Sequence, residues 1–242
     1  MGGICMIRRR KWYVRLISSL LITLGLSLFG GFNVQAKVVD EPRIILDMAH
    51  YDSKLDKGAT YKDWNERDIV NSITEKVGDK LVESGFTVLY TREKDKTTTI
   101  KDRINFTKDN DYWLYLSIHA NSNDSSKPGT GCEAYSNNEW SLSNNILKDL
   151  ENELGLTRRK SPEATPYYNR KIDNSTLLEV GFINNDFDRD IMLNKQDEIA
   201  TIIANNITLD YNKDKIGSGE KTMTKELKMF DGSVVPMKVV YY

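Results

Sequence analysis

The chain of 242 residues contains two histidines, His50 and His119, and each follows a short hydrophobic run. Residues 44–46 (Ile-Ile-Leu) precede the first, and residues 113–116 (Trp-Leu-Tyr-Leu) precede the second. Imidazole is a common zinc ligand, and hydrolytic zinc sites take three protein ligands, often two histidines and a carboxylate, with the fourth position left to water. The helical motif His-Glu-x-x-His is absent, so a metal site here requires ligands from separate segments.

The elements that must position these histidines alternate between strand and helix patterns. Apolar runs predict strands at 43–47, 86–90, 112–118, 131–135 and 176–180, and apolar spacings of three or four predict helices at 65–84, 102–108, about 142–154 and 196–209. This alternation predicts an α/β fold: a single domain with an open, twisted, mostly parallel sheet flanked by helices on both faces. Parallel strands end at one edge of a sheet, so we expect His50 and His119 to meet there.

Two glutamates are candidates to complete a site with the histidines. Glu66 opens the first predicted helix and therefore returns near the end of the first strand. Glu179 lies inside the apolar strand Leu177-Leu178-Glu179-Val180, where a charged group is costly to bury unless it meets a metal, a partner or a substrate. We predict Glu66 as the carboxylate ligand and Glu179 as a general base.

Each of these residues also has an ordinary structural interpretation. His50 and His119 are compatible with surface or core positions that bind no metal. Glu66 fits equally well as the reciprocating residue of a capping box with Asp63, or as an acidic residue favoured by the helix dipole. Glu179 fits an edge strand or a salt bridge. Spacing alone therefore gives a zinc hypothesis and leaves these alternatives open.

Residues 1–36 have the features of an export signal. Four basic residues at 8–11 and Arg15 precede an uncharged apolar stretch over 16–32, and Val34-Gln35-Ala36 offers a small-residue cleavage site. We predict a signal peptide cut before Lys37. An uncleaved membrane anchor is the alternative, because 17 apolar residues approach the length that spans a bilayer. In both cases we expect the rest of the protein to be exported, with membrane contact only through an uncleaved segment.

The composition of the remaining chain excludes some partners. Without residues 1–36 it has 29 Lys and Arg against 35 Asp and Glu, so nucleic acid is not an expected partner. Cys5 precedes the apolar stretch and Cys132 is then alone, so we expect no intrachain disulfide, and Cys132 is typical of a buried strand residue. We expect a monomer with one domain over 41–210, and a linker and short tail over 211–242 with a hairpin around residues 231–232.

The order of several motifs resembles the zinc-dependent N-acetylmuramoyl-L-alanine amidases of the type 3 family, which are bacterial cell-wall hydrolases. The resemblance covers about residues 43–209, and the Ser-Ile-His-Ala-Asn and Glu-Val-Gly-Phe pieces are its most specific parts. The chain presents, in the order found in that family, Asp47-Met48-Ala49-His50, Glu66, Thr91-Arg92, Arg103, Ser117-Ile118-His119-Ala120-Asn121, Gly131-Cys132-Glu133, and Glu179-Val180-Gly181-Phe182 followed by Asn184, Asn185 and Asp188.

The resemblance implies a reaction and a role for each site residue. It implies hydrolysis of the amide between N-acetylmuramic acid and L-alanine in peptidoglycan. The residues concerned are His50, Glu66 and His119 as ligands of one Zn²⁺, Glu179 as the catalytic acid/base, Asn121 and Glu133 as candidate substrate contacts, and Asp47 and Arg103 as candidate supports of the ligands. For the last four, a strand-end hydrogen bond or a helix salt bridge is the alternative.

The sequence departs from the family around the first histidine. Members usually carry glycines there, whereas here Ala49 precedes His50 and Tyr51-Asp52 follow it. Ala and Tyr do not share the backbone freedom of glycine, so a different loop conformation is expected. A degenerate peptidoglycan-binding module is therefore one alternative function. A zinc peptidase cutting within the stem peptide is a second, because the motifs are chemically compatible with it. The span between Tyr135 and Thr176 is too short for an extra helix across the groove, which predicts an open site.

Overall fold

The computed structural model describes residues 42–50, 56–93, 96–123, 126–137, 141–159, 169–217, 221–228 and 234–241. The predicted signal or anchor over 1–36 lies outside the described residues. So do residues 160–168, which make up part of the span expected to leave the site open. Within the described part, no helix combines the length and the apolar character needed to cross a membrane.

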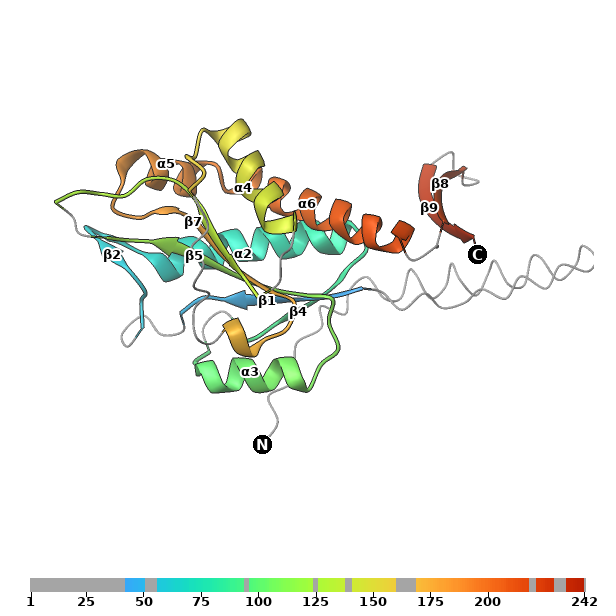
Figure 1. Cartoon of the computed structure of the whole chain (residues 1–242), viewed down its shortest axis with the longest axis horizontal. Helices are drawn as coiled ribbons and strands as arrows, with labels where there is room; N and C mark the ends of the chain where they lie inside the picture. The colour runs from blue at the N-terminus through green and yellow to red at the C-terminus, as the bar shows by residue number, and fades with distance from the viewer. Residues whose placement is uncertain are drawn as a thin grey trace, which may run out of the picture.

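A five-stranded sheet forms the centre of the fold, in the order β4-β1-β5-β7-β6 (Figure 1). Neighbours among β4, β1, β5 and β7 are parallel, and β6 pairs antiparallel with β7 at one edge. The strands are β1 (Arg43–Met48), β4 (Thr87–Tyr90), β5 (Leu114–Asn121), β6 (Glu133–Ser136) and β7 (Ser175–Phe182). The expected open, mostly parallel sheet is confirmed.

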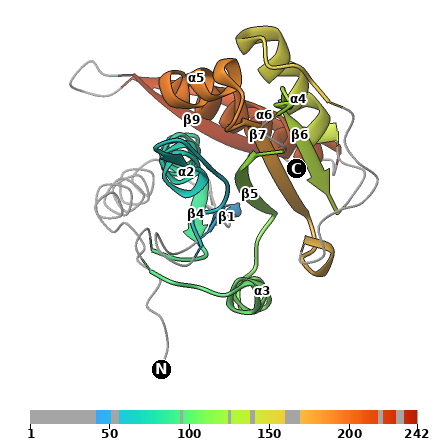
Figure 2. The same ribbon diagram turned by 90° about the vertical axis from the view of Figure 1, so that its left-hand side faces the viewer.

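Helices cover both faces of this sheet, as predicted. In two perpendicular views, α2, α4 and α6 lie on one side of the sheet and α3 lies on the other (Figures 1 and 2). The helices are α2 (Glu66–Glu83), α3 (Ile100–Lys108), α4 (Ser141–Leu154), α5 (Asp186–Asn194) and α6 (Gln196–Gly217), with the short 3₁₀ helix η2 (Asn169–Lys171) before β7.

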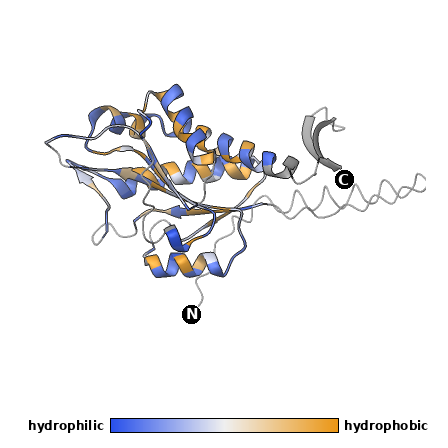
Figure 3. Cartoon of the chain, viewed as in Figure 1, coloured by the Kyte–Doolittle hydropathy of each residue, from blue (hydrophilic) through white to orange (hydrophobic). Residues whose placement is uncertain are grey.

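Alternation along the strands divides the core into two unequal parts. Side chains such as Ile44, Leu46 and Leu116 face the large core under α2, α4 and α6. Ile45 and Tyr115 point the other way, into a small core with Ile104 and Phe106 beneath α3. Because both faces are covered, most residues of β1, β4 and β5 are apolar, and the helices carry both polar and apolar residues (Figure 3). This packing fixes the strand ends that carry the site.

Helix α2 begins and ends where its sequence predicts. The Asn65 side chain accepts a hydrogen bond from the backbone N–H of Asp68, which makes Asn65 the N-cap. Gly85 follows the C-cap with a φ of +95°, which lies in the region that favours glycine. The capping-box alternative for Glu66 is wrong, because Asp68 is the acidic partner of the Asn65 cap and Glu66 is the first residue of the helix.

Several elements differ from the sequence predictions. A short hairpin, β2 (Thr60–Tyr61) with β3 (Trp64–Asn65), precedes α2. Helix α5 was not expected, because its nine residues are too few for the apolar spacing to repeat. Helix α6 continues through residues 211–217, which the sequence assigned to a linker, because Tyr211 packs edge-to-face on Phe86 and Trp113. The tail forms the antiparallel pair β8 (Lys221–Lys228) and β9 (Val234–Tyr241), with residues 229–233 between them.

Candidate metal and acid/base site

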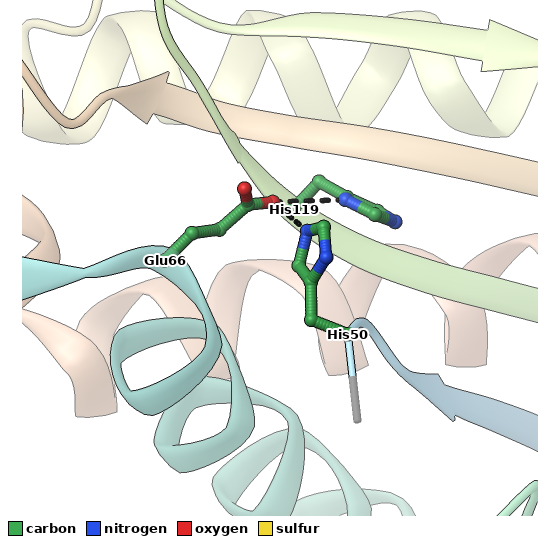
Figure 4. Close-up of side chains that lie close together, drawn as sticks. All are labelled: His50, Glu66 and His119. Carbon is green, nitrogen blue, oxygen red and sulfur yellow. Dashed lines mark hydrogen bonds and ion pairs between the residues drawn. The ribbon is translucent and has the colours of Figure 1, made fainter. Parts of the chain in front are cut away.

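Three separate elements bring His50, Glu66 and His119 together at the carboxyl edge of the sheet (Figure 4). His50 follows β1, Glu66 opens α2, and His119 lies near the end of β5. Oε1 of Glu66 is 2.9 Å from Nδ1 of His119 and 3.0 Å from Nε2 of His50. The two imidazole rings meet edge-to-face with centroids 5.2 Å apart. The predicted meeting of the two histidines at this edge is thus what the structure contains.

The chemistry of this cluster fits a metal ion. One ligand atom from each of His50, Glu66 and His119 lies within 4.8 Å of the others. Nε2 of His50 is enclosed, and it faces Oε1 of Glu66 at 3.0 Å. A metal ion held here would engage this enclosed nitrogen together with the carboxylate that faces it. Two imidazoles and one carboxylate are also the donor set of a hydrolytic zinc site.

The electrostatics of Glu66 agree with a ligand role. Burial alone would raise the pKa of its carboxyl, but interactions with His119 and His50 outweigh burial and hold the pKa well below its usual value. Backbone N–H groups of Ala59 and Ala120 donate to its two oxygens at 2.8 and 3.1 Å. Glu66 is therefore ionised and held in place, as a metal ligand must be.

His50 is held in an unusual backbone conformation. Its φ is +57°, in the left-handed region that non-glycine residues rarely adopt. The Arg92 guanidinium donates to the carbonyl oxygens of Met48, Ala49 and His50 at 3.2, 3.2 and 2.5 Å, and so fixes this turn. The different loop conformation expected from the missing glycines stays a prediction, because residues 51–55 lie outside the described part of the chain.

Asp56 and Gly58 complete the surroundings of His50. Oδ1 of Asp56 lies 2.6 Å from Nδ1 of His50, which leaves Nε2 to face Glu66. A carboxylate on the far nitrogen of a histidine fixes its tautomer and its ring orientation. A Cβ on Gly58 would come within 2.4 Å of Glu66 Oε2 and 2.5 Å of His50 Nε2, so the backbone closes over the cluster only because this residue is glycine.

Glu179 lies beside the cluster, in a row of three residues across the sheet. His119 on β5 is the register partner of Glu179 on β7, which is the register partner of Glu133 on β6. Side chains at paired positions point to the same face of a sheet. Burial first, and then the charges of Glu66 and Glu133, raise the pKa of Glu179 to about 7. Its Oε2 is enclosed and makes no hydrogen bond among the described residues.

Glu133 belongs to a second polar group on the far side of Glu179. Its carboxylate pairs with the guanidinium of Arg159 and accepts hydrogen bonds from Tyr135 Oη at 3.0 Å and Asn121 Nδ2 at 3.3 Å. Burial and this contact with Glu133 raise the pKa of Tyr135 to about 12. Asn121 and Glu133, both predicted as substrate contacts, are thus bonded to each other beside Glu179.

Asp47 and Arg103 form a buried ion pair beneath the site, with Nη1 of Arg103 2.9 Å from Oδ2 of Asp47. Thr91 and Ser117 also donate to the Asp47 carboxylate, at 2.6 and 2.8 Å. Burial would raise the pKa of Asp47, but Arg103 and these hydrogen bonds lower it below the usual value. Arg103 Nη2 also lies 3.4 Å from the carbonyl oxygen of His50, so the pair connects β1, α3, β5 and the His50 turn.

Sequence reasoning missed Asp56, Gly58 and Arg159, and it recorded Arg92 only as part of a motif. An Asp-x-Gly element between His50 and Glu66 was the signal available for the first two. No pattern pointed to Arg159, because it follows α4 and reaches Glu133 only through tertiary packing. Cys132 is buried and its pKa is raised to about 12, mainly by burial, which agrees with a strand residue that is no nucleophile.

Comparison with known families agrees with this geometry. A family model described as N-acetylmuramoyl-L-alanine amidase matches residues 44–209. LytC of Bacillus subtilis, named as an N-acetylmuramoyl-L-alanine amidase, is 32% identical over 150 residues, which make up 59% of this chain and 29% of LytC. The uncharacterized protein YqiI of the same species is 29% identical over 185 residues, 74% of this chain and 89% of YqiI. The chain thus spans less than a third of LytC and most of YqiI.

The fold is also similar to a solved structure. The catalytic domain of CwlV, an N-acetylmuramoyl-L-alanine amidase from Bacillus (Paenibacillus) polymyxa, superposes with a TM-score of 0.63 at 27% identity. The superposition covers 71% of this chain and 98% of that domain. The family match over residues 44–209 includes His50, Glu66, His119, Glu133, Arg159 and Glu179.

Proposed function

The chain belongs to the N-acetylmuramoyl-L-alanine amidase family, a family of hydrolases, and on that premise we propose that it cleaves the amide between N-acetylmuramic acid and L-alanine with one zinc ion. His50, Glu66 and His119 are the proposed ligands. The observation that carries the proposal is the convergence of these three ligand atoms beside Glu179, whose pKa is raised to about 7.

The ligands and the acid divide the chemistry between them. When bound, zinc supplies Lewis-acid polarisation of the scissile carbonyl and acidifies water. Glu179 in its ionised form takes the proton of the attacking water and then passes it to the nitrogen of L-alanine as the amide breaks. A group with a pKa near 7 can do both at neutral pH, because neither its acid nor its base form is scarce there.

The surrounding residues are assigned to positioning. We assign Asp56 to the orientation of the His50 ring, and the Asp47–Arg103 pair to the support of the turn that carries His50. Asn121 and Glu133 line the side of Glu179 opposite the ligands and are the proposed substrate contacts. The substrate lies in the cell wall, so we propose that the protein is exported, consistent with residues 1–36, and acts as a monomer.

Digestion of purified peptidoglycan by the full-length chain, kept in mild detergent, tests this function. We expect new amino-terminal L-alanine with intact muramic acid, and loss of product on chelation and its return with zinc. Other new amino ends would identify a stem-peptide peptidase instead. No zinc-dependent product at all would leave a binding module without enzymatic activity.

A further inference from the structure

Arg159 is held beside the acid/base residue by contacts from three segments. Its guanidinium pairs with Glu133, lies 5.1 Å from the ring centroid of Phe182, and places Nη1 3.4 Å from the carbonyl oxygen of Thr130. Stacking on a ring and pairing with a carboxylate fix the plane of a guanidinium. Arg159 therefore presents its charge in a defined direction.

The backbone at Arg159 is fixed as well. The backbone N–H of Cys132 donates to the carbonyl oxygen of Thr157 at 2.9 Å. The backbone N–H of Arg159 donates to the carbonyl oxygen of Cys132 at 3.0 Å. Cys132 and Arg158 form a parallel bridge, so this segment lies along the start of β6 like a short extra strand. Arg158 and Arg159 consequently have different surroundings, and Arg158 lies near Glu151 at a distance of 3.8 Å.

The fixed guanidinium is still accessible. The Arg159 side chain is 42% exposed, whereas Glu133 beneath it is 7% exposed. Its described contacts use Nε and Nη1, and a guanidinium carries five N–H donors on more than one edge. A structural ion pair alone does not require an exposed, stacked arginine at this place, because Tyr135 and Asn121 already donate to Glu133.

The position of Arg159 relative to Glu179 indicates what it binds. Glu133 is the register partner of Glu179, one strand spacing or about 5 Å to the side. In stem peptides, L-alanine is followed by D-glutamate joined through its γ-carboxyl, so an α-carboxyl follows the scissile amide closely and is either free or amidated. From the scissile nitrogen to that α-carboxyl carbon is one residue plus two bonds, roughly 6 Å of extended chain, which exceeds the strand spacing and reaches toward Arg159.

We propose that Arg159 binds the free α-carboxylate of the second stem-peptide residue, and that the enzyme therefore prefers a D-glutamate stem over its amidated D-isoglutamine form. This inference rests on the proposed function, because it assumes that the amide is cleaved next to Glu179. A charge-assisted bond to carboxylate is stronger than a bond to a neutral amide, and a guanidinium accommodates both carboxylate oxygens.

The test compares two soluble substrates, N-acetylmuramoyl-L-Ala-D-Glu and N-acetylmuramoyl-L-Ala-D-isoGln, with the full-length, zinc-loaded chain in mild detergent. We expect the wild type to show a kcat/KM roughly 10- to 100-fold higher for the carboxylate form. Arg159→Gln should cleave both at similar rates, close to the wild-type rate on the amide. Arg159→Lys keeps the positive charge but loses the planar guanidinium that contacts both carboxylate oxygens. It should keep part of the preference for the carboxylate substrate.

Arg158→Ala is the matched control, because Arg158 is the neighbouring exposed arginine and pairs with Glu151. It should retain the full preference. Equal cleavage of both substrates by the wild type overturns the assignment of Arg159 while leaving the amidase intact. An equal loss on both substrates in Arg159→Gln, with zinc content and circular dichroism unchanged, also overturns it and makes Arg159 structural. Failure of the wild type on both substrates and on whole peptidoglycan removes the proposed function itself.

Discussion

The region around Glu66 and the region around Glu179 share the carboxyl edge of one sheet but have opposite electrostatics. Two imidazoles face Glu66 and two backbone N–H groups donate to it, and its pKa falls well below the usual value. Glu179 has a carboxylate on the neighbouring strand and an enclosed oxygen without a described hydrogen bond, and its pKa rises to about 7.

The difference shows how one residue type serves two roles. A metal ligand must stay ionised, which requires positive or donating neighbours, whereas an acid/base group must exchange a proton near neutral pH, which requires burial and a nearby negative charge. Glu66 meets the first requirement through His50, His119 and backbone N–H groups, and Glu179 meets the second through burial and Glu133 on the neighbouring strand. Four experiments on these regions test the contrast, in order of decreasing effect.

Removal of a ligand should give the largest effect. His119→Ala takes one of three donors from the Glu66 region, so zinc content should fall from about one per chain to near zero and amidase activity should fall roughly 10⁴-fold or more. Metal analysis and end-group assays check this. Chelated wild type should recover with added zinc and the variant should not. Full zinc occupancy in the variant would show that His119 is no ligand.

Loss of the acid/base group should reduce turnover without loss of metal. Glu179→Gln keeps the shape of the side chain and cannot exchange the proton, so kcat should fall about 10²- to 10⁴-fold while zinc content stays near one. Glu153→Gln, on the exposed surface of α4, is the matched control and should leave both unchanged. Zinc loss in Glu179→Gln would show that Glu179 is a zinc ligand, and Glu66 and Glu179 would then not have different roles.

The raised pKa of Glu179 predicts a pH-dependent stability in the metal-free protein. An acid whose folded pKa of about 7 exceeds its usual 4.5 binds more protons when folded, so its contribution to stability falls as the pH rises through this window. The free energy of unfolding of wild type relative to Glu179→Gln should fall by about 3 kcal/mol from pH 4.5 to 7 and then stay level. Urea titrations of the metal-free wild type and the metal-free variant measure this difference in the free energy of unfolding. A difference that does not change with pH contradicts the buried environment assigned to Glu179.

A smaller effect is expected from the carboxylate behind His50. Asp56→Asn weakens the orientation of the imidazole without removing a ligand, so zinc affinity should fall about 10- to 100-fold. Competition with a chromogenic chelator measures the affinity. Asp63→Asn, in the exposed turn between β2 and β3, should bind zinc like the wild type. Unchanged zinc affinity in Asp56→Asn would show that Asp56 does not contribute to zinc binding.

Prediction from sequence succeeded where a pattern is local. The strands and α2 follow from apolar runs and helical spacing, because propensity and burial agree there. It failed at α5, whose nine residues are too few for the apolar spacing to repeat, and at the end of α6, where Tyr211 packs on Phe86 and Trp113. Contacts across the chain decide such boundaries.

By itself the sequence determined an α/β fold, a pair of histidines at strand ends and, through the order of the motifs, four residues for one site. These follow from local periodicity and from the rule that parallel strands end at one edge. Only the tertiary structure decided which groups surround each residue: Arg92 and Asp56 at His50, two imidazoles at Glu66, and Glu133 with Arg159 beside Glu179. The reason is physical, since pKa and orientation depend on neighbours within a few ångströms, and those neighbours come from distant segments brought together by strand pairing.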